Sequence, residues 1–134
     1  MDLENTTMRT QNYSKKRQAI YELLLSTKEH PTAEWIYNTL KDEYADLSLG
    51  TVYRNLKLLE KNGMIKSVAV VNGCERYDAL TSPHSHFVCT KCSRVIDVFY
   101  RDEVPDFIRN MHIDGADRVD YFSLIYYGTC NNCE

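Results

Sequence analysis

Two Cys-x-x-Cys motifs constrain the fold of this 134-residue chain more than any other feature. The first contains Cys89 and Cys92, and the second, after 37 intervening residues, contains Cys130 and Cys133. Each motif places two sulfurs on one side of a tight turn, and two such turns complete a tetrahedral ligand set for Zn²⁺. Thiolates fill all four positions and leave none for water, which is typical of a structural zinc. The motifs therefore predict a zinc that joins the last strand of a C-terminal module to its first strand.

The composition is that of a soluble globular protein, with 43% apolar and 26% charged residues. We find no apolar run of the roughly 20 residues that a membrane helix needs, and the first residues lack the apolar core of a signal peptide. We therefore expect a cytoplasmic protein with no membrane partner, in which thiols stay reduced. In that setting five cysteines favour metal ligation over disulfides, with redox-active dithiols or an iron–sulfur cluster as the alternatives.

Three helices and a β-hairpin are expected in the first 79 residues. Apolar residues recur at helical spacing in segments 15–27, 33–44 and 49–62. The residues expected to cap or end these helices are Ser14, Thr32, Ser48 and Gly63. Asn72-Gly73, a strong hairpin signal, then separates a strand rich in β-branched residues from a second strand. Three helices followed by a hairpin are typical of a winged helix-turn-helix domain.

The net charge of −3, from 16 basic and 19 acidic residues, conceals local clusters of bases. The first 80 residues hold 11 bases and 11 acids, and segments 9–17 and 54–66 are rich in bases. The third expected helix turns one apolar face inward and presents an aromatic residue and bases on the other. A solvated surface is the ordinary explanation of such a face, but the hairpin and the second basic cluster favour DNA binding in the major groove. The residues expected at DNA are Lys15, Arg17, Gly50, Thr51, Tyr53, Arg54 and Lys57.

After residue 83 the pattern changes to that of a small α/β module. We expect strands over 84–92, 94–100 and 120–127, and a short helix over 102–111. A module of about 50 residues seldom folds without a metal or a partner subunit. The chain is thus expected to have an α+β fold, with a winged-helix domain at 1–79, a hinge at 80–83 and a zinc-stapled domain at 84–134.

A second group of candidate ligands consists of histidines and aspartates. His84 and His86 lie two apart on an expected strand and so point to one face. Asp78 precedes them, Asp97 lies on the next strand, and His30 lies far away between the first two helices. Such nitrogen and oxygen donors suit Fe²⁺ or Mn²⁺. Surface or packing roles are equally open for the histidine pair, and the spacing alone does not join His30 to the other four residues.

Four segments resemble the ferric-uptake-regulator family: HPTAEWIY, TVYRNLKLLEKNGMI, RYDALTSPHSHFVCTKCSRVID and LIYYGTCNNC. The resemblance extends from Ser14 to Cys133 and implies a homodimeric, metal-dependent winged-helix repressor, not an enzyme, that binds a palindromic DNA operator. It implies a DNA-binding domain followed by a dimerisation domain. It further implies structural zinc on Cys89, Cys92, Cys130 and Cys133.

Within the family, the regulatory site resembles that of the peroxide-sensing members. This resemblance implies Fe²⁺ or Mn²⁺ on His30, Asp78, His84, His86 and Asp97. It also implies that peroxide oxidises His30 or His84, so that the metal and the operator are released. Iron-responsive or zinc-responsive repression without peroxide sensing is the alternative within the family. Iron-sensing members more often have Glu at the positions of Asp78 and Asp97, which favours peroxide here.

Two positions depart from the family or match none of its ligands. Gly50 stands where Ala or Pro is common, and Cys74, in the hairpin turn, is expected to be a free surface thiol. Outside the family, the alternatives are a zinc-stapled interaction module without a DNA role and a zinc nucleobase deaminase. The deaminase motif His-x-Glu is absent, because His86 follows His84-Ser85.

Overall fold

The computed structural model describes residues 3–100 and 105–134, and for residues 3–14 it describes the backbone. The chain divides into two compact units, Met1–Thr81 and Ser82–Glu134, called here the N-terminal and the C-terminal unit. In the described ranges, no helix combines the length and the apolar character that crossing a membrane requires.

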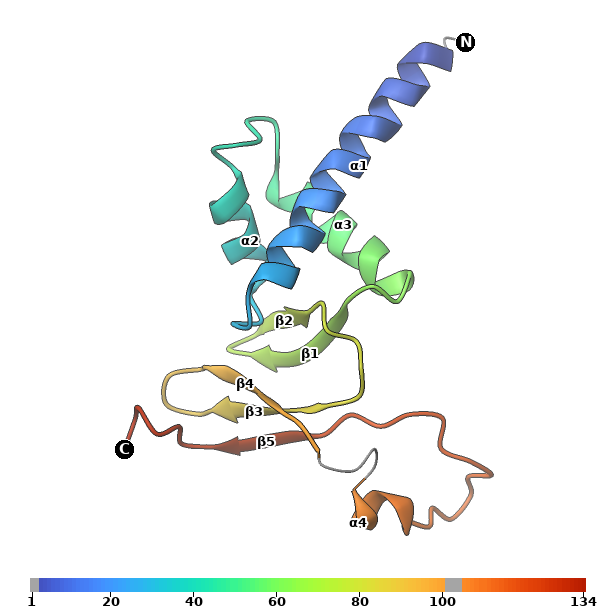
Figure 1. The fold of residues 1–134 in the computed structure, drawn as a ribbon, viewed down its shortest axis with the longest axis vertical. Coiled ribbons are helices and arrows are strands. Elements are labelled where there is room, and N and C mark those ends of the chain that lie inside the picture. The colour runs from blue at the N-terminus through green and yellow to red at the C-terminus, as the bar shows by residue number, and fades with distance from the viewer. Residues whose placement is uncertain (1–2, 101–104) are drawn as a thin grey trace. The chain divides into compact units, whose positions relative to one another are not determined.

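Three helices form the larger part of the N-terminal unit (Figure 1): α1 (Leu3–Ser26), α2 (Ala33–Leu40) and α3 (Leu49–Lys61). The predicted caps of α2 and α3 are confirmed. Thr32 Oγ1 accepts a hydrogen bond from the amide of Trp35, and Ser48 Oγ accepts one from Thr51, each at 3.1 Å. Gly63 follows α3 with a φ of 75°, a left-handed conformation that ends the helix at little cost for glycine.

The predicted limits of the first two helices are wrong at one end each. Helix α1 begins at Leu3, so Ser14 lies inside the helix and does not cap it. The segment before Ser14 contains neither Pro nor Gly, and nothing in its sequence stops a helix from continuing through it. Helix α2 ends at Leu40 rather than Tyr44, and the chain continues in turns.

The predicted hairpin is present as β1 (Lys66–Val71) and β2 (Cys74–Asp78), which pair antiparallel. Asn72 and Gly73 both have positive φ, 53° and 78°, as a two-residue turn between twisted strands requires. Apolar residues from all three helices, the loop before α3 and the hairpin form one core. Its buried members are Ile20, Leu24, Ala33, Ile36, Leu40, Leu47, Val52, Leu56, Leu59, Ile65, Tyr77 and Ala79. The order of elements and this shared core define a winged helix-turn-helix unit.

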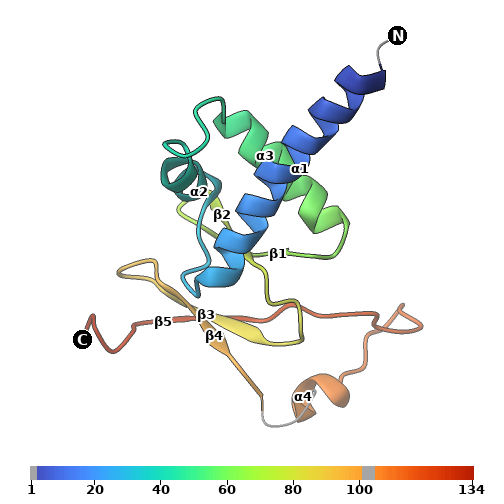
Figure 2. The ribbon, with the colours of Figure 1, turned by 45° about the horizontal axis from the view of Figure 1, so that its top comes forward.

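In its described residues, the C-terminal unit is a three-stranded sheet with one short helix (Figure 2). Its elements are β3 (Ser85–Cys89), β4 (Val95–Val98), α4 (Asp106–Arg109) and β5 (Ile125–Gly128). The strand order is β4-β3-β5, with β3 antiparallel to β4 and parallel to β5. Parallel pairing brings the carboxyl ends of β3 and β5 to one edge of the sheet.

The elements of this unit are shorter than the sequence predicts: β3 covers Ser85–Cys89 of the expected strand 84–92, and β4 covers Val95–Val98 of the expected strand 94–100. The expected strand 120–127 pairs only from Ile125, because the register aligns Ile125 with His86 near the start of the five-residue β3. The expected helix 102–111 is a single turn, Asp106–Arg109, and its first residues lie outside the described range. Phe107 and Met111 of its apolar face are both more than half exposed, so little packing supports a longer helix within this unit.

Candidate metal centres and nucleic-acid interface

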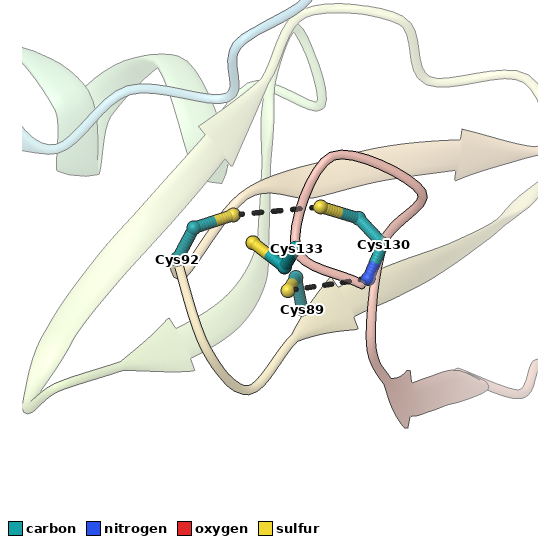
Figure 3. Close-up of side chains that lie close together, drawn as sticks. All are labelled: Cys89, Cys92, Cys130 and Cys133. Atoms are coloured by element: carbon teal, nitrogen blue, oxygen red, sulfur yellow. Dashed lines mark hydrogen bonds between the residues drawn. The ribbon is translucent and has the colours of Figure 1, made fainter.

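The four motif cysteines converge at the edge where β3 and β5 end together. Cys89 is the last residue of β3, and Cys130 lies two residues beyond β5. Figure 3 shows the four side chains directed toward one another from the two turns. All four Sγ atoms lie within 4.8 Å of one another, and Sγ of Cys92 is 3.7 Å from Sγ of Cys130. Tetrahedral Zn–S bonds of about 2.3 Å require sulfurs about 3.8 Å apart, so this cluster fits zinc.

The local electrostatics prepare one of these sulfurs for a cation. The amide of Cys130 donates to Sγ of Cys89 at 3.3 Å, and this bond is the main cause that lowers the pKa of Cys89 to about 6. Hydrogen bonding to the Cys130 and Cys92 sulfurs raises the pKa of Cys133 to about 12. Hydrogen bonds from backbone amides therefore favour the thiolate form of Cys89, and a bound divalent cation favours deprotonation of the other thiols.

The N-terminal unit carries two of the predicted regulatory ligands side by side. His30 lies in the loop before α2, and Asp78 is the last residue of β2. His30 Nδ1 is 3.6 Å from Asp78 Oδ2, and both side chains are buried. The other carboxylate oxygen, Oδ1, accepts a hydrogen bond from the amide of Leu80 at 2.8 Å. A buried imidazole beside an oriented carboxylate offers a divalent cation one nitrogen and one oxygen donor.

The C-terminal unit gathers the other three predicted ligands. His86 on β3 and Asp97 on β4 are direct cross-strand partners. Asp97 Oδ1 lies 3.0 Å from His84 Nε2 and 3.4 Å from His86 Nε2, so two imidazoles meet one carboxylate oxygen. His84 Nδ1 is hydrogen-bonded to the carbonyl of Ser82 at 2.8 Å, which fixes the ring with Nε2 toward Asp97. The donors have the nitrogen and oxygen chemistry of an iron or manganese site.

Helix α3 presents the predicted DNA-binding face to solvent. Tyr53, Arg54 and Lys57 are exposed, as is Gly50. Thr51 differs, because its side chain is buried and its hydroxyl is hydrogen-bonded to Ser48 Oγ at 2.8 Å and accepts from Arg54 Nη2 at 3.1 Å. Thr51 therefore holds the Arg54 guanidinium in place rather than facing outward, a role that sequence reasoning missed.

The basic cluster on α1 is only partly available to a ligand. Lys15 is exposed and Arg17 is half-buried. Lys16, between them, forms a 3.0 Å ion pair with Asp46 in the loop before α3, and its hydrogen bond lowers the pKa of Asp46. Lys16 thus connects α1 to that loop, which no pattern in the sequence indicates.

The N-terminal unit is a winged helix whose third helix is basic and exposed. The C-terminal unit is an α/β unit with clustered cysteine, histidine and aspartate donors. Together these features define a metal-dependent DNA-binding regulator. Residues 9–114 match the model of the ferric uptake regulator family. The chain belongs to this family.

Its relatives include several proteins named for peroxide responses. The peroxide operon regulator of Bacillus subtilis (strain 168) is 34% identical over 120 residues, which cover 88% of this chain and 81% of the relative. The peroxide-responsive repressor PerR of Staphylococcus epidermidis is 33% identical, over 89% of this chain and 79% of the relative. Among solved structures, the peroxide stress regulator of Campylobacter jejuni superposes with a TM-score of 0.75 at 28% identity, covering 99% of this chain and 100% of the other.

Proposed function

We propose that this protein is a peroxide-responsive, metal-dependent transcriptional repressor that acts in the cytoplasm. The observation that carries the proposal is the cluster in which His84 and His86 both approach one oxygen of Asp97. Aspartate at this position, rather than glutamate, and the peroxide-responsive relatives support peroxide as the signal.

Two kinds of metal centre follow from the donor sets. Cys89, Cys92, Cys130 and Cys133 would hold a structural Zn²⁺. The regulatory ion would be held by two ligands of the N-terminal unit, His30 and Asp78, and by three of the C-terminal unit. Residues 80–83 would act as the hinge between the two units. The support is the donor chemistry and the ordering of each half within its own unit.

The response to peroxide would be a single oxidation of the chain. A bound Fe²⁺ would supply redox chemistry toward H₂O₂ next to the imidazoles, with no net change in its own oxidation state, and Mn²⁺ would not. The net change is addition of one oxygen atom to a ring, with water as the other product: the imidazole loses two electrons and H₂O₂ gains them. An oxidised His30 or His84 is a poorer ligand. The protein is thus consumed by its signal and does not turn over.

Operator binding would use the exposed face of α3 in the major groove, with Arg54 and Lys57 at base edges or phosphates. Lys15 and Arg17 would contact flanking phosphates. A homodimer would present two such helices, which fits a palindromic operator. The support is the exposure of this face and the wing built by β1 and β2.

Mass spectrometry after reaction with dilute H₂O₂ tests the proposal. In the Fe²⁺ protein, tryptic fragments 29–41 and 77–91 separate His30 from His84, and one of them should gain 16 Da at the histidine. The Mn²⁺ protein should remain unmodified. Met64 and Met111 are exposed and serve as internal controls, because free oxidant in solution would modify them as well. Histidines that stay unmodified in both metal forms would contradict peroxide sensing and favour an iron-responsive repressor.

A further inference from the structure

The loop that carries His30 is fastened to the wing by Arg76 of β2. The Arg76 guanidinium donates from Nε to the carbonyl of His30 and from Nη2 to the carbonyl of Glu29, the latter at 2.8 Å. The amide of Tyr77, the next residue, donates to the carbonyl of Pro31 at 3.2 Å. Two consecutive residues of β2 therefore bind three consecutive carbonyls of the loop.

The backbone of His30 needs such support. Its φ of 50° is left-handed, a conformation that is unfavourable for a residue with a Cβ. Residues persist in this region when the surrounding structure over-determines them. The carbonyls of Glu29 and His30 belong to the two peptide groups on either side of the His30 α-carbon. The angles φ and ψ of His30 describe the orientation of these two groups, so the hydrogen bonds from Arg76 hold both angles.

The same strand also sets the partner of the His30 ring. Arg76 and Asp78 are two residues apart on β2, so their side chains leave the strand on one face. Arg76 fixes the loop, and the carboxylate of Asp78 then meets His30 Nδ1 at 3.6 Å. The Arg76 side chain is half-buried and hydrogen-bonded to the loop carbonyls, and this burial lowers its pKa from the ordinary value.

We propose that Arg76 is the positioning residue for His30, holding its imidazole beside Asp78 before any metal arrives. The inference rests on the proposed function only in naming the ion that uses this pair. Arg76 is not a ligand and acts through the backbone of the loop. Because the fork of Nε and Nη2 spans two carbonyls, lysine can replace one of these bonds but not both.

Hydrogen exchange on the metal-free protein tests the positioning directly. In Arg76→Met, the Tyr77 amide should exchange at least about tenfold faster, as expected when charge-assisted bonds to the loop are lost. Arg76→Lys should fall between Met and the wild type. Arg109→Met, which removes an arginine from α4, is the matched control and should leave this amide unchanged. Unaltered exchange of Tyr77 in both Arg76 variants would overturn the proposal.

Metal binding and oxidation supply readouts that general destabilisation would not move. Arg76→Met should weaken Mn²⁺ binding by about 10- to 100-fold, the range for loss of a residue that orients a ligand. After reaction of the Fe²⁺ form with H₂O₂, the ratio of oxidised His30 to oxidised His84 should fall. Unchanged Mn²⁺ affinity together with an unchanged ratio would refute a role for Arg76 in the site.

The hydrogen-exchange and oxidation experiments also distinguish failure of this proposal from failure of the proposed function. A wild-type protein that takes up no oxygen would refute peroxide sensing, while the Tyr77 exchange rates still decide the role of Arg76. If Arg76→Met does not fold, Arg76→Lys decides both the exchange rate and the Mn²⁺ affinity, because it keeps the charge and one donor.

Discussion

Removal of the structural zinc should unfold the C-terminal unit and leave the N-terminal unit folded. In the described part of residues 82–134, the buried apolar side chains are those of Val88 and Val95, together with the motif cysteines Cys89 and Cys130. Full burial of two valines contributes about 3–6 kcal/mol, whereas a structural zinc site contributes about 10–16 kcal/mol. The metal is therefore the larger source of stability, while the N-terminal unit has a continuous core of its own.

The perturbation is Cys92→Ser, and Cys74→Ser is the matched control. Both cysteines are exposed and each variant loses one sulfur, but Cys74, expected in the hairpin turn, is the first residue of β2 and is not a member of the cysteine cluster. Hydrogen exchange followed by mass spectrometry should show that the amides of β3 and β5 lose protection in Cys92→Ser. Amides of α1 and α3 should keep theirs, and zinc content should fall from one ion per chain to near zero.

Cys74→Ser should match the wild type in zinc content and in exchange. Protected β3 and β5 amides in zinc-free Cys92→Ser protein would show that the sheet is stable without the metal. That result would refute the reasoning from the small number of buried side chains.

Three further predictions concern the regulatory site and DNA. Asp97→Ala should abolish metal-dependent operator binding while zinc content stays unchanged, and full operator binding would contradict its assignment as a ligand. Thr51→Val should weaken operator binding about fivefold in fluorescence anisotropy, because a partly buried hydrogen bond to Arg54 is worth about 1 kcal/mol. In an Arg54→Ala background, the same Thr51→Val change should leave operator affinity unaltered. An equal loss of affinity in that background would show that Thr51 contacts DNA itself. Operator affinity should fall steeply with salt concentration, and a flat response would argue against phosphate contacts.

Features encoded within a few residues could be predicted from the sequence. The caps at Thr32 and Ser48 use hydrogen bonds to amides three residues ahead, and the Asn72-Gly73 turn depends on two adjacent residues that tolerate positive φ. The strand over 120–127 was predicted too long because its length depends on a partner. The carbonyl of Leu124 still accepts a hydrogen bond from the amide of His86 at 3.3 Å, but β3 begins one residue earlier, at Ser85, so residues 120–123 lie beyond its start.

In the candidate sites, too, features encoded within a few residues could be predicted, and features that depend on distant residues could not. Repeated cysteine spacing predicted the sulfur cluster, since each pair lies in one tight turn. The approach of His30 to Asp78 came from the family resemblance, because 47 intervening residues separate them and no local pattern connects them. Arg76 was missed because it binds backbone carbonyls, which every residue possesses and which leave no mark in a side-chain pattern.

The proposed division of ligands explains why one damaged side chain would release DNA. An ion shifts the balance between two arrangements of the units only by binding one of them more tightly. To change the ratio of their populations from 1:99 to 99:1, the ion must bind the favoured arrangement with about 10⁴-fold higher affinity. Three ligands of one unit would bind the ion in either arrangement, so the difference in affinity would come from the two proposed ligands of the other unit, His30 and Asp78. Oxidation of His30 would leave Asp78 alone on that side and remove most of the difference, while a zinc on the four cysteines, all of which belong to the C-terminal unit, would keep the sheet of that unit intact.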